Sequence, residues 1–302
     1  HNATAYTLLP TQGRPGYTRK FINMYLKKDG TAFTDQEGWQ TLPFTEEVKD
    51  RDPRLAQSIR TPGYKRIGAK RVQGPDLGVT ITGYQPIKFV QDTTASGGQI
   101  DRNDRSTCDM PVFRYAEVLL NYAEAKAELN EMSEEVWNKT IKPLRERAGV
   151  TSIYPTTADP YMVEYFQNQV TDPFILEVRR ERGIELTMEN VRYDDIIRWH
   201  QGELFARPWK GIWIAASETP IDLNGDGVND CIVTSDPNNK SPLKILFIDG
   251  ASEAGHKLSQ GTSGNILPAT AIERKWHDYK YVKPIPTTAL QENPNLTQNP
   301  KW

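Results

Sequence analysis

The chain has 302 residues, with 37 Lys and Arg against 39 Asp and Glu and a formal net charge of −2 at pH 7. This balance excludes the basic excess that favours nucleic acid as a partner. No run approaches the ~20 apolar residues that a membrane-spanning helix needs. Two cysteines, Cys108 and Cys231, are too few for a disulfide scaffold or a thiolate zinc site, and the sequence leaves open whether they bridge.

The first 108 residues are rich in turn formers and predict loops with short helices. Residues 19–26 form a short amphipathic stretch. Asp52 followed by Pro53 predicts a helix start, because an Asp side chain caps free N–H groups and Pro suits the first turn. Residues 79–90 alternate loosely between apolar and polar and predict a strand or hairpin.

The strongest periodic signal covers residues 111–130. Apolar residues recur there at steps of three and four, at Phe113, Ala116, Leu120, Ala123 and Ala127. This spacing predicts an amphipathic helix, with Pro111 in its first turn and Asp109 as its cap. The alanines would let a second helix approach closely.

Three further helices are predicted before residue 200. One begins at Ser133 and ends at Gly149, with Pro143 kinking or splitting it. The next begins at Asp172 and runs to about residue 188, and its many charges fit a salt-bridge network or a solvated face. The last covers residues 193–199.

These helices predict a mainly α fold. Helix hairpins like tetratricopeptide units would form a scaffold over residues 109–200, although no clean repeat of the ~34-residue kind is present. Loop-rich segments, 1–108 and 201–302, would pack against it, the C-terminal one with minor β structure.

Five blocks of sequence carry a family signature. They are RDPRL at 51–55, FRYAEVLLNYAEA at 113–125, RERAGV at 145–150, the helix pair 177–186 with RYDDIIRW at 192–199, and the end, with PIP at 284–286 and NPNLTQNPKW at 293–302. In this order they resemble the SusD/RagB family, nutrient-binding lipoproteins of the Bacteroidetes outer membrane. Lys301 replaces the family's usual Gly.

The resemblance implies that residues 1–302 are the C-terminal domain of such a protein. The family's N-terminal part, with its lipidated cysteine and first tetratricopeptide-like helices, is expected to be missing. It further implies a place at the surface of the outer membrane through that lipid anchor, a SusC-like TonB-dependent transporter as partner, and an oligosaccharide as ligand, without nucleic acid.

The sequence carries no signature of catalysis. It has no Gly-Lys pair to end a phosphate-binding loop and no H-E-x-x-H metal motif, and its four histidines lie far apart. No pair of carboxylates stands out for glycoside hydrolysis. We therefore predict a non-catalytic protein that binds glycan and delivers it to the transporter. The alternatives are a peptide-binding lid of the same transporter type and, less favoured, a glycoside hydrolase.

Tryptophans and tyrosines are the candidates for holding a sugar, because an aromatic face packs against the apolar C–H face of a sugar ring. Three lie in loop-like context outside the family blocks: Trp39, Tyr64 and Trp213. An exposed loop Trp is costly without a partner. The alternative is that each ring packs into a small core under a loop.

A loop at residues 222–230 has the spacing of a calcium site. Asp222, Asn224 and Asp226 stand at positions 1, 3 and 5 of an EF-hand-like loop, the Val228 carbonyl at 7 and Asp230 at 9. Position 12 is Val233 in place of Glu, so a bidentate ligand must come from elsewhere. The alternative is a solvated turn, which these residues also favour. We expect a structural calcium ion that fixes a long loop.

Overall fold

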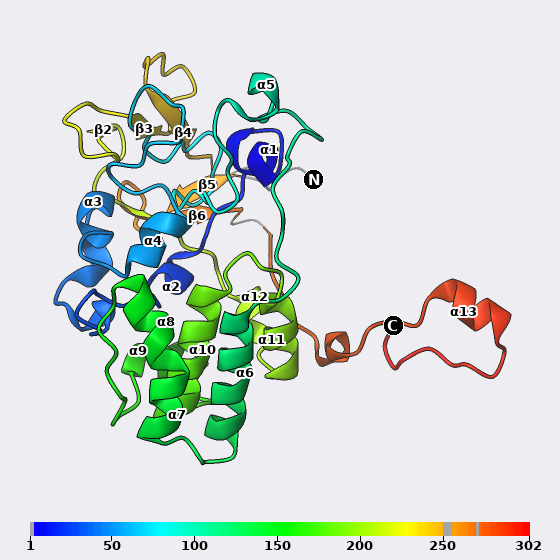
Figure 1. The fold of residues 1–302 in the computed structure, drawn as a ribbon. Coiled ribbons are helices and arrows are strands. Elements are labelled where there is room, and N and C mark those ends of the chain that lie inside the picture. The colour runs from blue at the N-terminus through cyan, green and yellow to red at the C-terminus, as the bar shows by residue number, and fades with distance from the viewer. Residues whose placement is uncertain (1–2, 250–254, 270–271) are drawn as a thin grey trace.

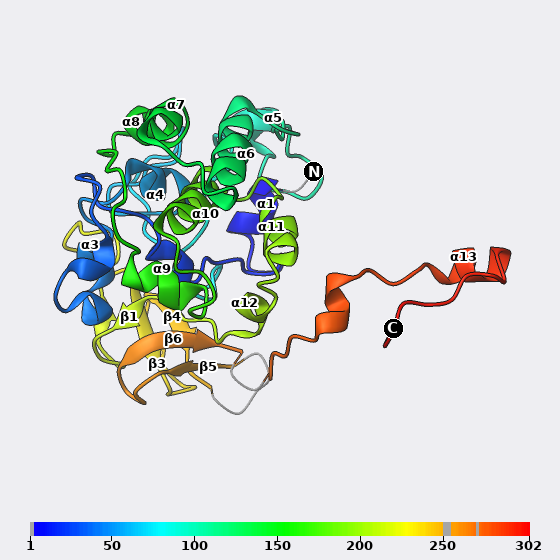
Figure 2. The same ribbon diagram turned by 90° about the horizontal axis from the view of Figure 1, so that it is seen from below.

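The computed structural model describes residues 3–249, 255–269 and 272–302. Figures 1 and 2 show a helical group at one end of the body, the strands at the other end, and a C-terminal arm that reaches away from both. None of the helices in the described part has the length and apolar character to cross a membrane. The helix-rich fold with minor sheets is as predicted, whereas the likeness to tetratricopeptide units stays a prediction.

The helical group is built around α10 (Pro173–Glu185), which packs against α6 (Tyr115–Glu128) and α8 (Ile141–Ala148). Asp172 lies at the start of α10, as predicted, and caps it by accepting from the N–H groups of Phe174 and Ile175. The core between these helices holds the predicted stripe of α6 with residues of the facing helices: Ala116, Leu120, Ala123, Ala127, Trp137, Ile141, Leu144, Val178 and Leu186.

The start of α6 corrects the prediction. Phe113 is 74% exposed and lies outside the core, and Arg114, not Asp109, is the N-cap. The backbone of Arg114 is extended while its guanidinium binds Glu185 and Glu189, so the helix begins only after it. The apolar spacing of the sequence could not predict this contact, because it joins Arg114 to residues more than seventy positions away.

The predicted helix 133–149 is split into α7 (Glu134–Lys139) and α8. The Ser133 hydroxyl accepts from Val136 N, and Gly149 ends α8 with a φ of +81°. The break lies at Thr140, which places Pro143 in the first turn of α8, where its missing N–H costs no helix hydrogen bond.

The segment before residue 109 contains short helices joined by loops. Asp52 caps α4 as predicted, accepting from Arg54 N. Residues 79–90, all of them described, form no strand, and their β pairing is one isolated bridge between Ile59 and Pro86. The hairpin prediction was wrong, because these residues are held by contacts with distant loops, such as Tyr17 N to Tyr84 O. The elements of this segment are α1 (Ala3–Leu8), α2 (Arg19–Ile22), η1 (Phe33–Asp35), η2 (Trp39–Thr41), α3 (Phe44–Glu47), α4 (Pro53–Ser58) and α5 (Ala95–Gly98).

Two small sheets follow the helical group. One has the antiparallel order β1-β6-β5, from Trp213–Ile214, Gly264–Pro268 and His256–Leu258. The other has the order β2-β3-β4, from Pro220–Ile221, Cys231–Thr234 and Lys244–Phe247, with β3 and β4 parallel. Cys108 and Cys231 are both free. Three short helices precede these strands: α9 (Pro160–Tyr165), α11 (Arg192–Arg198) and α12 (Glu203–Ala206).

A second core joins the N-terminal helices, α9 and the sheets. Its members include Tyr25, Tyr84, Phe166, Val233 and Ile266, all fully buried. Beyond it the arm carries η3 (Asp278–Tyr281) and α13 (Thr287–Glu292), and the Trp302 indole N–H closes it by donating to the carbonyl of Val282 at 2.8 Å.

Candidate functional site

A cavity of about 320 Å³ lies where the second core meets the first sheet, and Trp39 and Trp213 both line it. Its walls come from α2, η2, α9, the chain leading into β1, and the turn between β5 and β6. The structure therefore brings together two of the three aromatic residues that the sequence singled out. The other lining groups are mostly amides, hydroxyls and charged side chains.

Strand pairing positions Trp213. It is the first residue of β1, opposite Asn265 of β6, and its neighbours Ile212 and Ile214 are buried. Since side chains alternate along a strand, Trp213 points to the other side and is half-buried. The Asn265 side-chain amide donates to Gly211 O at 3.1 Å, which fixes a second lining residue.

Trp39 begins the short helix η2, directly after Gly38 with a φ of +73°. Its ring meets Tyr161 edge-on at 5.9 Å between centroids and Phe33 at 6.3 Å. The Arg19 guanidinium donates to Trp39 O at 3.0 Å. The half-buried indole is therefore held on several sides while it still lines the cavity.

Arg19 ties this wall to the core. Its Nε lies 3.2 Å from Glu47, which is fully buried and accepts the Tyr84 hydroxyl at 2.8 Å. Burial raises the pKa of Glu47, while the Arg19 charge lowers it. Arg19 and Asn23 both line this cavity, and the atoms Arg19 Nη1 and Asn23 Oδ1 are buried without a hydrogen-bond partner among the described residues.

Tyr64 lies outside this cavity. Its ring sits 5.7 Å from the Arg60 guanidinium, and its carbonyl accepts from Gln73 N at 2.8 Å. The structure thus separates Tyr64 from the two tryptophans. Sequence reasoning missed Arg19, Asn23, Tyr161 and Asn265, because they come from elements far apart in the chain and no local motif marks them.

The loop 222–230 is held by its own side chains. Asp222 accepts from Gly225 N at 2.7 Å and Gly227 N at 2.8 Å, and Asp226 accepts from Val228 N at 2.9 Å. Asp230 accepts from Leu223 N at 2.8 Å and from the Asn224 side chain at 3.1 Å. Burial raises the pKa of Asp230, and Asp222 and Asp226 add to this effect. In the described part of the chain, no three His, Cys, Asp or Glu side chains converge to hold a metal ion, so calcium stays a prediction.

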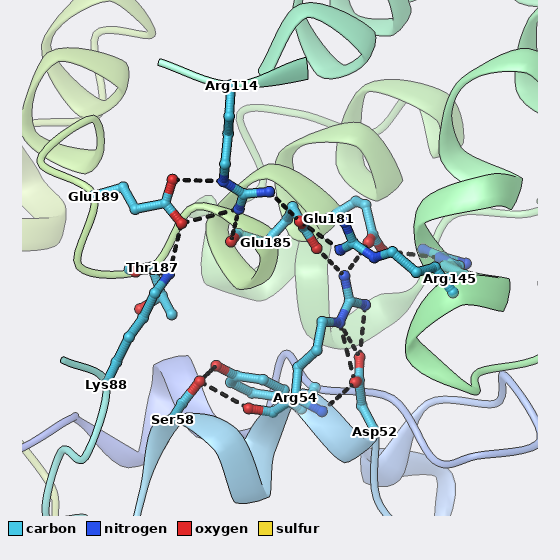
Figure 3. A network of polar contacts seen from close by, with 12 residues as sticks. Asp52, Arg54, Ser58, Lys88, Arg114, Arg145, Glu181, Glu185, Thr187 and Glu189 are labelled. Carbon is cyan, nitrogen blue, oxygen red and sulfur yellow. Dashed lines mark hydrogen bonds and ion pairs between the residues drawn. The ribbon is translucent and has the colours of Figure 1, made fainter. Parts of the chain in front are cut away.

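The charges of α10 form a buried ion-pair network around a second cavity of about 430 Å³ (Figure 3). Arg54 binds Asp52, Glu181 and Glu185, and Arg114 binds Glu185 and Glu189. This is the first of the two predicted alternatives, a salt-bridge network in place of a solvated face. Because these charges already have partners, we assign them no ligand.

Comparison with known proteins covers nearly the whole chain. The sequence profile of the SusD family matches residues 11–302, while no curated protein matches. The fold is similar to a SusD-like carbohydrate-binding protein from Bacteroides fragilis NCTC 9343, with 25% identity and a TM-score of 0.58 over 93% of this chain and 48% of that one. It is also similar to a SusD-like protein of the same organism, with 18% identity and a TM-score of 0.56 over 95% and 47%. The chain spans about half the length of these structures, and it belongs to the SusD family.

Proposed function

We propose that this chain binds a glycan, without breaking any bond in it, in the cavity that Trp39 and Trp213 line. The observation that carries the proposal is the meeting of these two loop tryptophans in one cavity. A sugar ring would lie with its C–H face against an indole, while side-chain amides such as those of Gln40 and Gln260 bond its hydroxyls. One protein of similar fold is a SusD-like carbohydrate-binding protein, which supports the same ligand class.

The cavity is poorly suited to glycoside hydrolysis. Canonical hydrolysis uses two carboxyl groups roughly 5–10 Å apart. Glu164 alone is acidic among the described residues that line this cavity. The residues that line the cavity therefore support glycan binding without hydrolysis.

We further infer the place of the whole protein from its family. It would sit at the outer surface of the outer membrane and pass its glycan to a SusC-like TonB-dependent transporter. Co-purification of the full-length protein with a tagged transporter from the native membrane tests this step. Recovery of the protein without any transporter would contradict it.

The binding proposal is tested with the purified 302-residue chain on an array of neutral and acidic polysaccharides, followed by calorimetry on the best hit. Trp39→Ala and Trp213→Ala should each weaken binding by about 2 kcal/mol, roughly 30-fold, because each removes a large apolar platform. Trp302→Ala, at the end of the arm, is the matched control and should bind as the parent does.

Three results would overturn the proposal. They are binding to no glycan, tight binding to peptides instead, which favours a peptide-binding lid, or release of new reducing ends from the bound sugar, which favours a hydrolase. Tyr64→Ala tests the third predicted aromatic residue. It should leave the affinity unchanged, since Tyr64 does not line the cavity. Melting curves must show that each variant folds.

A further inference from the structure

The cavity of Trp39 and Trp213 has an uneven charge. Among the described residues, its lining includes Arg19, Lys20 and Lys210 but only one carboxylate, that of Glu164. The ion-pair partner of Arg19 is Glu47, which lies buried behind the wall. Neither Lys20 nor Lys210 forms an ion pair within the described ranges. The two lysines therefore outnumber the one carboxylate among the described lining residues, that of Glu164, whose charge acts on Lys20.

A further cation adds to this positive field. The Arg207 guanidinium donates to the backbone carbonyl of Glu164 at 3.2 Å, which holds it beside the cavity. Partial burial lowers the pKa of Lys20, and the charges of Arg207 and Lys210 lower it further, while the Glu164 carboxylate raises it in part. Like charges held close together are unfavourable unless an anion relieves them.

The buried part of the cavity wall contributes a further positive side chain, Arg19. Arg19 is 3% exposed and its Nη1 has no hydrogen-bond partner in the part of the structure described. A buried N–H of a guanidinium without an acceptor is costly, and an anionic oxygen makes the strongest bond to it. The cavity thus combines two aromatic side chains with more positive than negative groups among its described lining residues.

We propose that the glycan bound here is acidic, and that its carboxylate or sulfate group lies against Lys20 and Lys210. This inference rests on the proposed glycan binding in the same cavity. The apolar face of the sugar would take its place on the indoles, and the anionic group would set which sugar is preferred. Neutral sugars of the same shape would bind more weakly, because the lysine charges would stay unpaired.

The test compares matched pairs of sugars by calorimetry: oligogalacturonate with its carboxyl-reduced form, and a chondroitin sulfate oligosaccharide with its desulfated form. The first pair reports on a carboxylate and the second on a sulfate. We expect the anionic member of one pair to bind about 10- to 100-fold tighter at low salt, with the difference shrinking as salt is added. Lys20→Gln with Lys210→Gln should abolish that preference. Lys240→Gln with Lys283→Gln, which changes the net charge equally outside the cavity, should keep it.

A second experiment tests for a gain of affinity. Glu164 is exposed and its side chain has no ion pair among the described residues, so Glu164→Gln should fold normally and bind the acidic sugar roughly 3-fold tighter, because a repelling charge is gone. If a neutral sugar binds as tightly as its anionic match, and Glu164→Gln changes nothing, the acidic preference is refuted while glycan binding stands. If no member of either pair binds, and the polysaccharide array also shows no binding, the proposed glycan binding itself is refuted.

Discussion

Trp39, Tyr64 and Trp213 share one local sequence pattern, an aromatic ring within two residues of a Gly, yet only the two tryptophans line one cavity. What separates them is the distant chain around each ring. Trp39 meets Tyr161 and Trp213 lies opposite Asn265, whereas Tyr64 packs beside Arg60. Sequence alone ranks such residues by chemistry, because the partners that turn a ring into a binding platform come from elsewhere in the chain.

The loop 222–230 carries the next prediction at the scale of single residues. We propose that it binds calcium, with Asp222, Asn224, Asp226, Asp230 and the Val228 carbonyl as ligands. At a calcium concentration about 100-fold above the dissociation constant, the ion should stabilise the chain by about 2.7 kcal/mol, seen as a rise in melting temperature. Asp226→Asn should remove this response, because it deletes a ligand charge but keeps the acceptor for Val228 N.

Asp29→Asn is the matched control for this loop. Asp29 is exposed and accepts from the N–H two residues ahead, at Thr31, as Asp226 does at Val228. It should leave the calcium response intact. A melting temperature that calcium does not move, in the parent chain, would show that the loop is a turn stabilised by its own hydrogen bonds.

At the scale of elements, four helix ends were predictable from local residues, whereas the start of α6 was not. Asp52, Ser133, Asp172 and Gly149 act within a few residues of themselves, so their types and spacing are enough. The start of α6 depends on Arg114 reaching carboxylates more than seventy residues away. The failed hairpin over residues 79–90 has the same cause, since distant loops satisfy its backbone.

The cap of α10 gives a prediction for this scale. Asp172→Ala should lower the free energy of unfolding by about 1 kcal/mol, because two N–H groups at the helix start lose their acceptor. Urea denaturation measures the change. Asp172→Asn keeps a side-chain oxygen at the same place and should lose much less. Equal losses in both variants would mean that the charge of Asp172, and not its hydrogen bonds, stabilises the helix.

At the scale of the whole molecule, the ion pairs of α10 join parts of the chain that the sequence left as separate segments. Arg54 lies on α4, and its carboxylate partners Glu181 and Glu185 lie on α10 (Figure 3). Burial of these charges is costly, and the many mutual hydrogen bonds offset that cost. The network therefore holds the N-terminal helices on the helical group, and its strength depends on the carboxylates staying ionised.

Acid should weaken this ion-pair network between the N-terminal helices and the helical group. Burial opposes the charge of Glu185, but hydrogen bonds from Arg147 and Arg114 outweigh it and lower the pKa of Glu185 to about 2, from 4.5. A carboxylate whose pKa is lower in the folded than in the unfolded state stabilises the fold fully at pH values above its unfolded pKa. This contribution is lost as the pH falls through the folded pKa. Glu185 therefore contributes roughly 3 kcal/mol at neutral pH, which should disappear between pH 4.5 and 2.

Urea denaturation of the parent chain and of Glu185→Gln across this pH range measures the contribution. The variant should be less stable at pH 7, because Arg54, Arg114 and Arg147 lose a charged partner, and the two curves should converge as the pH falls towards 2. Glu135→Gln, which breaks an exposed pair with Lys139, should run parallel to the parent. A constant gap between the parent and Glu185→Gln over the whole range would show that the carboxyl group acts through packing and not through its charge.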